Sequence, residues 1–527
     1  GQTSVYAHLE KFNGPISEYV VKEQYRLKKS KVDLSPYKGE FIVQKGEVIA
    51  YSGNSGSSGG PHLHFDIRDE KQRPLNPLSF GFDEILARTP PIAQNIFVKT
   101  LDKNARVSGV FGTKKYALKR IGNDYRLEEP VEAIGKIGLM LEAHDKLDYS
   151  RFRCGINTIN VTVGSQKTFG QHIERFAFSE QREIYRHMSF ENLVQEGDRI
   201  HKLYIDDGNK LSFYDSDEQR GKLDLEEGEI LPITISMMDA YGNESMVSLR
   251  IIGKHSEPTT TKSHSKFSTE LIDNTMVFNV PKKVQDSKVR LNGLPLEVSY
   301  STQYADHYLL DMRKELPKVA EVNNEFIPFD FKNTVAHGQK YNYYDDRIDI
   351  YFQRESLFDT LYLESSYLFD SLSNLEEWSL GRNTIPLRKS IKITLKPQLA
   401  YNKRNYRVYN VSNKSPSYEG GIWNDGVISF WTRSFGDYAL LADTLAPSIT
   451  PVRINQDHLI FKIKDDKSGI KEYKTLVNGE WVLMHYDYKR NLIWSEKLYK
   501  NKPFKGVVNV LVTDNTGNQQ IYETTLN

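Results

Sequence analysis

Short runs in which apolar and polar residues alternate recur along the whole chain, separated by Gly, Pro, Asn and Asp. Clear examples are residues 3–9, 347–352, 390–395 and 427–432. Alternation with a period of two gives a strand one buried and one exposed face, and such runs bounded by turn residues are typical of antiparallel sheets. The pattern predicts an all-β chain with little helix. The acidic, leucine-bearing stretch 371–380 is the segment we expect to be helical.

Residues 1–82 form the first predicted unit, a small antiparallel β domain. Its predicted strands are 3–9, 40–43 and 46–51, each bounded by turn residues. The stretch 19–31 between them carries six charged residues and few apolar ones, so we expect it to be an exposed insertion.

Two later segments, 90–256 and 446–527, have the same order of motifs. Each opens on a proline-marked linker and closes on Asp-x-x-Gly-Asn, at 239–243 and at 514–518. The sequence predicts an immunoglobulin-like β-sandwich for each, the first carrying an insertion over 171–217. We interpret the closing motif as an Asx turn with a positive-φ glycine. Calcium binding is the minor alternative, because one carboxylate per turn is far fewer than the six to eight oxygens that calcium takes.

A polar segment, residues 257–266, separates the first of these repeats from a β-rich region, 267–445, which could hold two modules. Tyrosines 341, 343 and 344 could contact a sugar or a partner, but half-buried packing is the more common role of tyrosine in sandwiches.

Composition narrows the functional classes. The 527 residues carry 70 Lys and Arg against 69 Asp and Glu, a net charge of +1, which argues against nucleic-acid binding through bulk charge. No apolar run approaches 18 residues, so the sequence predicts no transmembrane segment. The single cysteine, Cys154, excludes an intramolecular disulfide and a thiolate zinc site.

The segment with the clearest chemistry is 51–68, a glycine-rich loop followed by a predicted strand. Because side chains alternate along a strand, His62 and His64 share one face, about 6 to 7 Å apart, and Leu63, Phe65 and Ile67 share the other. Two such imidazoles can converge on one metal, or one can bind the metal while the other reaches the metal-bound water. A His-x-His pair alone is a weak signal, since solvated histidine pairs are common.

Three motifs in order resemble the lysostaphin/LytM-type zinc endopeptidases, which cut peptidoglycan. These are Tyr6-Ala7-His8-Leu9, the loop from Gly46 to Gly56, and Gly60-Pro61-His62-Leu63-His64-Phe65-Asp66. The resemblance covers about residues 1–82. It implies that His64 is a ligand of Zn²⁺, and that His8 and His62 are catalytic residues that orient or deprotonate the attacking water.

The family takes two further zinc ligands, a His and an Asp, from a segment upstream of the Tyr-Ala-His-Leu strand, and we expect that segment to precede Gly1. The chain as given is therefore expected to bind zinc weakly and to be inactive. Asp66 is a poor substitute ligand, because an acid at that position more often pairs with a neighbour such as Arg68.

The resemblance implies a zinc metalloendopeptidase acting on peptidoglycan peptides, in the bacterial periplasm or at the cell surface. The alternatives are a non-catalytic LytM-like regulator that binds envelope proteins, and an adhesin or scaffold that works through its sandwiches. The other histidines show no pair at metal-binding spacing, and we expect surface or packing roles for them.

Overall fold

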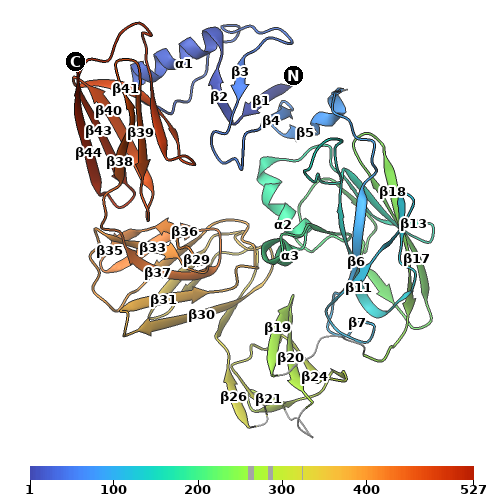
Figure 1. The fold of residues 1–527 in the computed structure, drawn as a ribbon. Helices are drawn as coiled ribbons and strands as arrows, with labels where there is room; N and C mark the ends of the chain where they lie inside the picture. Colours follow the sequence, from blue (N-terminus) through green and yellow to red (C-terminus); the bar gives the residue numbers. More distant parts are fainter. Residues whose placement is uncertain (83, 259–265, 283–288, 323) are drawn as a thin grey trace.

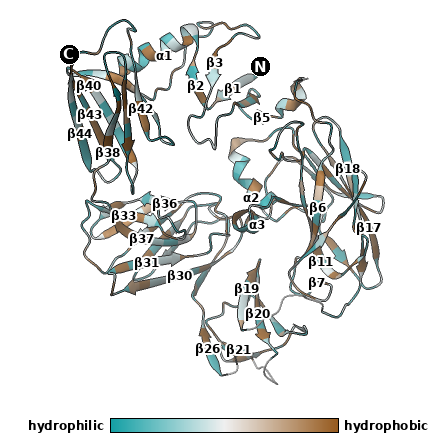
Figure 2. Ribbon diagram, in the orientation of Figure 1, coloured by the Kyte–Doolittle hydropathy of each residue, from teal (hydrophilic) through white to brown (hydrophobic). Residues whose placement is uncertain are grey.

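A computed structural model describes residues 1–82, 84–258, 266–282, 289–322 and 324–527 (Figure 1). Strands make up 49% of the chain and helices 7%, which confirms the all-β prediction. Apolar residues concentrate along the strands of the packed sheets (Figure 2). No helix in the ranges described is both long and apolar enough to cross a membrane.

The N-terminal domain contains two small sheets. Strand β4 (His64–Arg68) lies between β1 (Thr3–Ala7) and β5 (Pro74–Leu75), while β2 (Leu9–Phe12) pairs with β3 (Ala50–Ser52). The predicted strand 3–9 is divided at His8, whose φ of 57° is left-handed. A 3₁₀ turn, η1 (Pro77–Phe80), closes the domain.

The prediction of strands over 40–43 and 46–49 was wrong. The carboxylates of Glu40 and Glu47 accept hydrogen bonds from the backbone N–H groups of Tyr37 and Gln44, which hold this segment in turns. Ile42 is 77% exposed and no strand lies beside it to pair with. Of the predicted strand 46–51, the last two residues belong to β3.

The stretch 19–31 is largely exposed or half-buried, as predicted, and Gln24 is the one buried residue in it. Most of it belongs to a helix that was not predicted, α1 (Gly14–Leu27). Pro15 stands in the first turn of this helix, where its missing N–H costs nothing. The helix packs on the C-terminal sandwich through the Tyr25 ring, whose centroid lies 5.3 Å from that of Trp481. The helix was not predicted because most of its positions are charged or polar and few apolar residues mark its buried face.

The first sandwich is built on one extended set of 13 paired strands around a large core. The predicted insertion, 171–217, contains η2 (Phe178–Glu183), α2 (Ile184–His187) and α3 (Phe190–Gln195). The strands are β6 (Ile92–Thr100), β7 (Arg106–Val107), β8 (Thr113–Ala117), β9 (Lys119–Ile121), β10 (Asp124–Arg126), β11 (Val131–His144), β12 (Thr158–Val163), β13 (Gln166–His172), β14 (Ile200–Lys202), β15 (Tyr214–Ser216), β16 (Leu223–Leu225), β17 (Ile230–Met238) and β18 (Glu244–Gly253).

Two further β units follow, each with its own core. Most of the predicted linker 257–266 lies outside the described residues. The smaller unit pairs β19 (Ser268–Ile272), β20 (Thr275–Pro281), β24 (Ala305–Asp311) and β23 (Tyr300–Ser301) in one sheet, and β22 (Leu294–Leu296), β21 (Val289–Leu291), β25 (Val319–Val322) and β26 (Glu325–Pro328) in the other.

The larger unit, over 331–442, packs a six-stranded sheet on a five-stranded one. The six are β27 (Phe331–Val335), β30 (Leu361–Asp370), β31 (Leu375–Leu380), β37 (Gly436–Ala442), β33 (Tyr406–Asn410) and β34 (Ser417–Gly420); the five are β28 (Tyr341–Tyr344), β29 (Ile348–Phe352), β32 (Ile391–Leu395), β36 (Val427–Thr432) and β35 (Ile422–Asn424). The helix predicted over 371–380 was wrong, since β31 occupies most of it. Tyr341 and Tyr343 are half-buried, whereas Tyr344 is exposed.

The C-terminal sandwich has seven strands: β38 (Ser448–Ile454), β39 (Leu459–Lys464), β42 (Leu492–Glu496), β41 (Glu480–Asp487), β40 (Ile470–Val477), β43 (Gly506–Asp514) and β44 (Gln519–Leu526). In both repeats the Asp-x-x-Gly-Asn segment forms the predicted turn. The first Asp accepts backbone N–H groups, and Gly242 and Gly517 have φ values of 85° and 95°.

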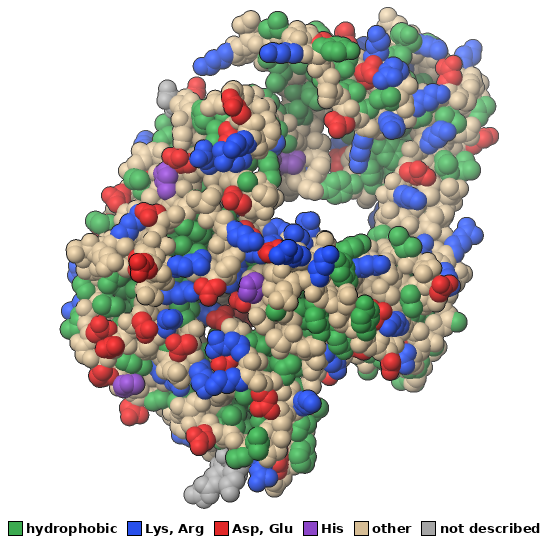
Figure 3. Space-filling view, turned by 180° about the vertical axis from the view of Figure 1, so that it is seen from behind, with side chains coloured by type: hydrophobic (Ala, Val, Ile, Leu, Met, Phe, Trp, Pro, Cys, Tyr) green, Lys and Arg blue, Asp and Glu red, His purple; other side chains and the backbone are tan. Residues whose placement is uncertain are grey.

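The domains are arranged in a closed ring (Figure 1), and Figure 3 shows the opening through its middle from behind. On one side the N-terminal domain contacts the insertion of the first sandwich, where the N–H of Asn76 donates to the carbonyl of Glu174. On the other side it contacts the last sandwich, where the Tyr25 hydroxyl donates to the carbonyl of Glu496.

A buried ion pair joins the first sandwich to the 331–442 unit. The Arg388 guanidinium lies 2.7 Å from the carboxylates of both Glu183 and Glu355, and Glu183 is 4% exposed. Because the pair is buried, loss of either partner leaves an uncompensated charge in the interior and strongly lowers the free energy of unfolding.

We predict that Arg388→Ala lowers the free energy of unfolding by about 3 kcal/mol, because it leaves the Glu183 carboxylate buried without a cation. Lys210→Ala is the matched control, since Lys210 also pairs with Glu355 but is 58% exposed, and its loss should cost less than about 1 kcal/mol. Urea denaturation of both variants measures the difference. Equal losses would contradict a dominant role for the buried pair.

A buried carboxyl in the first sandwich makes stability depend on pH. Burial raises the pKa of Asp145 to about 6. Because the folded chain binds this proton more tightly than the unfolded chain, stability falls as the pH rises from about 4 through about 6.

Asp145→Asn should therefore stabilise the protein at pH 7.5, by up to about 3 kcal/mol, and have little effect near pH 4. Asp148→Asn should act in the opposite direction, because the hydrogen bond from Arg88 lowers the pKa of Asp148. Thermal melts across pH 4 to 8 compare the two variants. A stabilisation that did not change with pH would rule out the titration of Asp145 as its cause.

Candidate functional site

Three imidazoles converge beside the glycine-rich loop of the N-terminal domain. The ring of His8 lies 4.8 Å from that of His62 and 5.5 Å from that of His64, measured between centroids. The pairing of β1 with β4 sets Ala7 opposite His64, and the left-handed backbone of His8 follows directly. The structure thus brings together all three predicted site residues, and their rings remain accessible to solvent.

The loop fixes the orientation of two of these rings. Nδ1 of His8 lies 2.7 Å from the carbonyl oxygen of Ser55, and Nδ1 of His62 lies 2.8 Å from that of Gly60. A carbonyl only accepts, so each Nδ1 carries the proton and each Nε2 has a free lone pair in the neutral ring. Both Nε2 atoms can therefore accept a proton from a water molecule.

His64 has the opposite tautomer. Its Nε2 lies 2.9 Å from Oδ1 of Asp66, and the second oxygen of Asp66 accepts from Arg68. Burial would raise the pKa of Asp66, but the hydrogen bonds from Arg68 and His64 outweigh it and lower the pKa. The ionised carboxylate holds the proton on Nε2 and leaves Nδ1 of His64 free to bind a metal, an arrangement typical of metal-ligating histidines.

The fit to zinc is partial. His64 presents one oriented nitrogen, whereas a catalytic zinc takes three protein ligands. Within the ranges described, the one group of three acidic or imidazole side chains with ligand atoms close together lies elsewhere, at Asp443, Asp465 and Asp514.

Glycine is required at one point of the loop. The N–H of His62 donates to the carbonyl of Gly53, and a Cβ on Gly53 would lie 2.7 Å from the backbone nitrogen of Glu10. The close approach of these backbones positions His62 against His8.

The C-terminal sandwich also contacts this loop. Nζ of Lys489 donates to the carbonyl and side-chain oxygens of Asn54, at 2.6 and 2.8 Å, and the Tyr488 hydroxyl donates to the carbonyl of Gly56. Sequence patterns could not predict these contacts, because the residues lie more than 430 positions apart.

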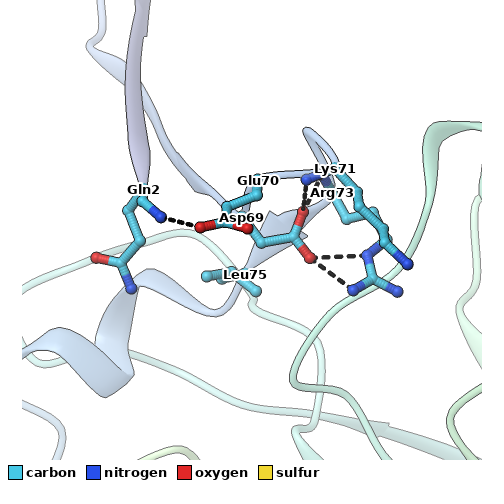
Figure 4. Close-up of a pocket in the computed structure, with 7 residues that line it drawn as sticks. Gln2, Asp69, Glu70, Lys71, Arg73 and Leu75 are labelled. Atoms are coloured by element: carbon cyan, nitrogen blue, oxygen red, sulfur yellow. Dashed lines mark hydrogen bonds and ion pairs between the residues drawn. The ribbon is translucent and has the colours of Figure 1, made fainter.

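Other candidate features carry less chemistry. The shallow pocket in Figure 4 is lined by residues 1, 2, 69–71, 73 and 75, at the other end of β1 and β4 from the histidines. His187 and His201 form a pair that their spacing in sequence did not reveal, but both are buried and His187 bonds to Tyr214. That pair has the predicted packing role.

Two family models match parts of the chain. Residues 27–77 match the model of peptidase family M23, which supports a LytM-type peptidase fold for this segment and includes His62 and His64. Residues 332–443 match the Zu5-like domain. No curated protein matches the chain.

Solved structures resemble the chain only weakly. A bacterial ice-binding adhesin involved in host cell surface retention is 9% identical, with 74% of this chain and 90% of that one covered and a TM-score of 0.12. The Plexin A4 extracellular region is 8% identical over 81% and 40% of the two chains, at a TM-score of 0.11. The first eight Ig domains of Down Syndrome Cell Adhesion Molecule are 7% identical over 84% and 67%, at 0.12. Scores this low carry no argument about function.

We predict that nitrogen NMR finds His64 protonated at Nε2 and His8 and His62 protonated at Nδ1 at neutral pH. Asp66→Ala should convert His64 to a mixture of tautomers, because it removes the acceptor. Asp69→Ala is the control, since Asp69 holds Arg73 instead and does not contact His64. A wild-type His64 protonated at Nδ1 would contradict the orientation described.

Proposed function

We propose that the N-terminal domain is the catalytic part of a zinc metalloendopeptidase that cleaves peptide bonds of bacterial peptidoglycan. The observation that carries the proposal is the convergence of His8, His62 and His64 on one surface, with one fixed N–H and one free nitrogen each. The match to peptidase family M23 over 27–77 supports the reaction class.

Each residue has a distinct role in this proposal. His64 would hold the metal through Nδ1, with its ring kept in place by Asp66 and Arg68. Nε2 of His8 or His62 accepts the proton of the attacking water, and the imidazolium so formed stabilises the developing oxyanion. A bound Zn²⁺ would lower the pKa of its water toward neutrality.

The proposed substrate determines the location. Peptidoglycan lies outside the cytoplasm, so we propose the bacterial periplasm or cell surface. The β-sandwiches would hold the catalytic domain at the envelope.

One observation favours a second candidate, a non-catalytic LytM-like protein that regulates or scaffolds other envelope proteins. Tyr488 and Lys489 already bind carbonyls of the loop at Asn54 and Gly56. In this candidate, the loop beside the histidines serves as an internal docking surface in place of a substrate groove.

The test is zinc binding and release of peptidoglycan fragments by the full-length gene product. We expect His64→Ala to lower zinc affinity and abolish release. His62→Ala should leave zinc affinity near wild type and reduce kcat by about 10²- to 10⁴-fold, the usual contribution of a general base.

His458→Ala is the control, because His458 is exposed on a turn of the C-terminal sandwich and should change neither quantity. A wild-type protein that binds zinc through His64 yet releases no fragment would reject the enzyme and favour the non-catalytic candidate.

A further inference from the structure

Three carboxylates from separate segments meet where the 331–442 unit joins the C-terminal sandwich. Asp443 directly follows β37, Asp465 directly follows β39, and Asp514 ends β43. Their ligand oxygens all lie within 4.8 Å of one another. Asp443 is 1% exposed and Asp514 is fully buried, so most of the charge of this acidic junction is removed from water.

No Lys or Arg in the described part of the chain forms an ion pair with these carboxylates. Their hydrogen bonds come from neutral donors: Ser468 N–H to Oδ2 of Asp443, Gly469 N–H to Oδ2 of Asp465, and turn N–H groups to Oδ1 of Asp514. Among the described residues, no hydrogen bond reaches the other oxygen, Oδ1, of Asp443 or Asp465. Three carboxylates this close repel strongly unless one of them is protonated or a cation lies between them.

A buried hydroxyl provides independent support. Tyr409 of β33 is 2% exposed, and its hydroxyl has no hydrogen-bond partner. Its ring lies 5.5 Å from that of Tyr418, whose hydroxyl donates to the carbonyl of Asn515 beside Asp514. Burial raises the pKa of the Tyr409 hydroxyl, and the nearby charges of all three acids raise it further. Oγ of Ser468, 4% exposed and beside Asp443, is also without a partner. Buried polar groups without a partner in the protein call for a bound ion or water molecule to satisfy them.

We propose that the acidic junction binds one Ca²⁺ ion, held by Asp443, Asp465 and Asp514. The site offers only oxygen atoms, which excludes a preference for the softer metals that choose imidazole or thiolate. Three carboxylates exceed the one or two that usually hold Mg²⁺, whereas Ca²⁺ takes six to eight oxygens and completes its shell with hydroxyls and water.

The first sandwich contains a natural comparison. Its turn is built in the same way, since the Asn243 side chain donates to the carbonyl of Ala87 as the Asn518 side chain donates to that of Asp443. Ala87 of the first sandwich therefore occupies the position that Asp443 has beside the C-terminal sandwich. The first sandwich keeps two carboxylates, Asp145 and Asp239. A third carboxylate distinguishes the proposed calcium site from an ordinary turn of this type.

Calcium here would fix the angle between two domains. Asp443 belongs to the segment leaving the 331–442 unit, while Asp465 and Asp514 belong to the C-terminal sandwich. An ion shared by both restrains the sandwich that contacts the glycine-rich loop of the N-terminal domain.

The experiment uses the full chain freed of metal with EDTA. We expect millimolar Ca²⁺ to raise its Tm, and Tb³⁺ to give tyrosine-sensitised emission that Ca²⁺ displaces. Asp443→Asn and Asp465→Asn should each weaken calcium binding by at least about tenfold, the loss typical even of an outer-shell partner. In EDTA, both variants should melt at or above the wild-type Tm, because the repulsion is relieved.

Asp145→Asn is the matched control in the first copy and should keep the whole calcium response. The proposal fails if Ca²⁺ neither raises the wild-type Tm nor displaces Tb³⁺, or if the double variant of Asp443 and Asp465 responds like wild type. A response to Mg²⁺ without one to Ca²⁺ would overturn the choice of ion, and an equal loss in Asp145→Asn would overturn the site.

Discussion

Residues 1–82 bury few of their apolar side chains against one another, and in this structure they rely on contacts with the domains beside them. Among the described residues of this N-terminal domain, Ile67 is the one buried hydrophobic side chain, and none of the hydrophobic cores includes a residue from 1–82. A unit of this kind gains its stability from its neighbours. Two neighbours supply it: the insertion of the first sandwich beside β5, and the C-terminal sandwich against α1. Closing the ring is therefore part of folding the candidate site.

This dependence explains which parts of the site could be predicted from sequence. The three histidines could be found because their geometry is local: strand alternation sets His64 beside His62, and a strand pairing brings His8 to both. The tautomers of the three histidines could not be predicted from sequence, since they depend on which acceptor each ring contacts. Lys489 and Tyr488 belong to no recognisable motif, and they contact the loop only because the arrangement of all the domains brings the C-terminal sandwich beside it. No local sequence pattern could have identified them.

Two of the errors in secondary structure, at 371–380 and at α1, have a common physical origin, which is a polar residue at a buried position. In β31, Glu376 is fully buried and accepts hydrogen bonds from Tyr367 and from the backbone of Gln398, so its charge suggested a helix surface where there is a strand interior. In α1, Gln24 is buried and donates to the carbonyl of Ser30. Each polar residue is satisfied by a partner outside its own element, and a pattern of apolar and polar positions contains no information about such partners.

The acidic junction shows the same limit for chemistry. In sequence, Asp443, Asp465 and Asp514 belong to a linker and two turns, and counting one carboxylate per turn makes calcium improbable. The fold brings together carboxylates from different segments, because the ends of β37, β39 and β43 lie close to one another. The C-terminal sandwich then makes two charged contacts with other domains. Its carboxylates lie at the junction with the 331–442 unit, and the Lys489 ammonium contacts the glycine-rich loop. A cation bound at the acidic junction restrains the orientation of the C-terminal sandwich, and the contact of Lys489 with the loop depends on that orientation. The accessibility of the loop beside the histidines therefore depends on how all the domains of the ring are arranged.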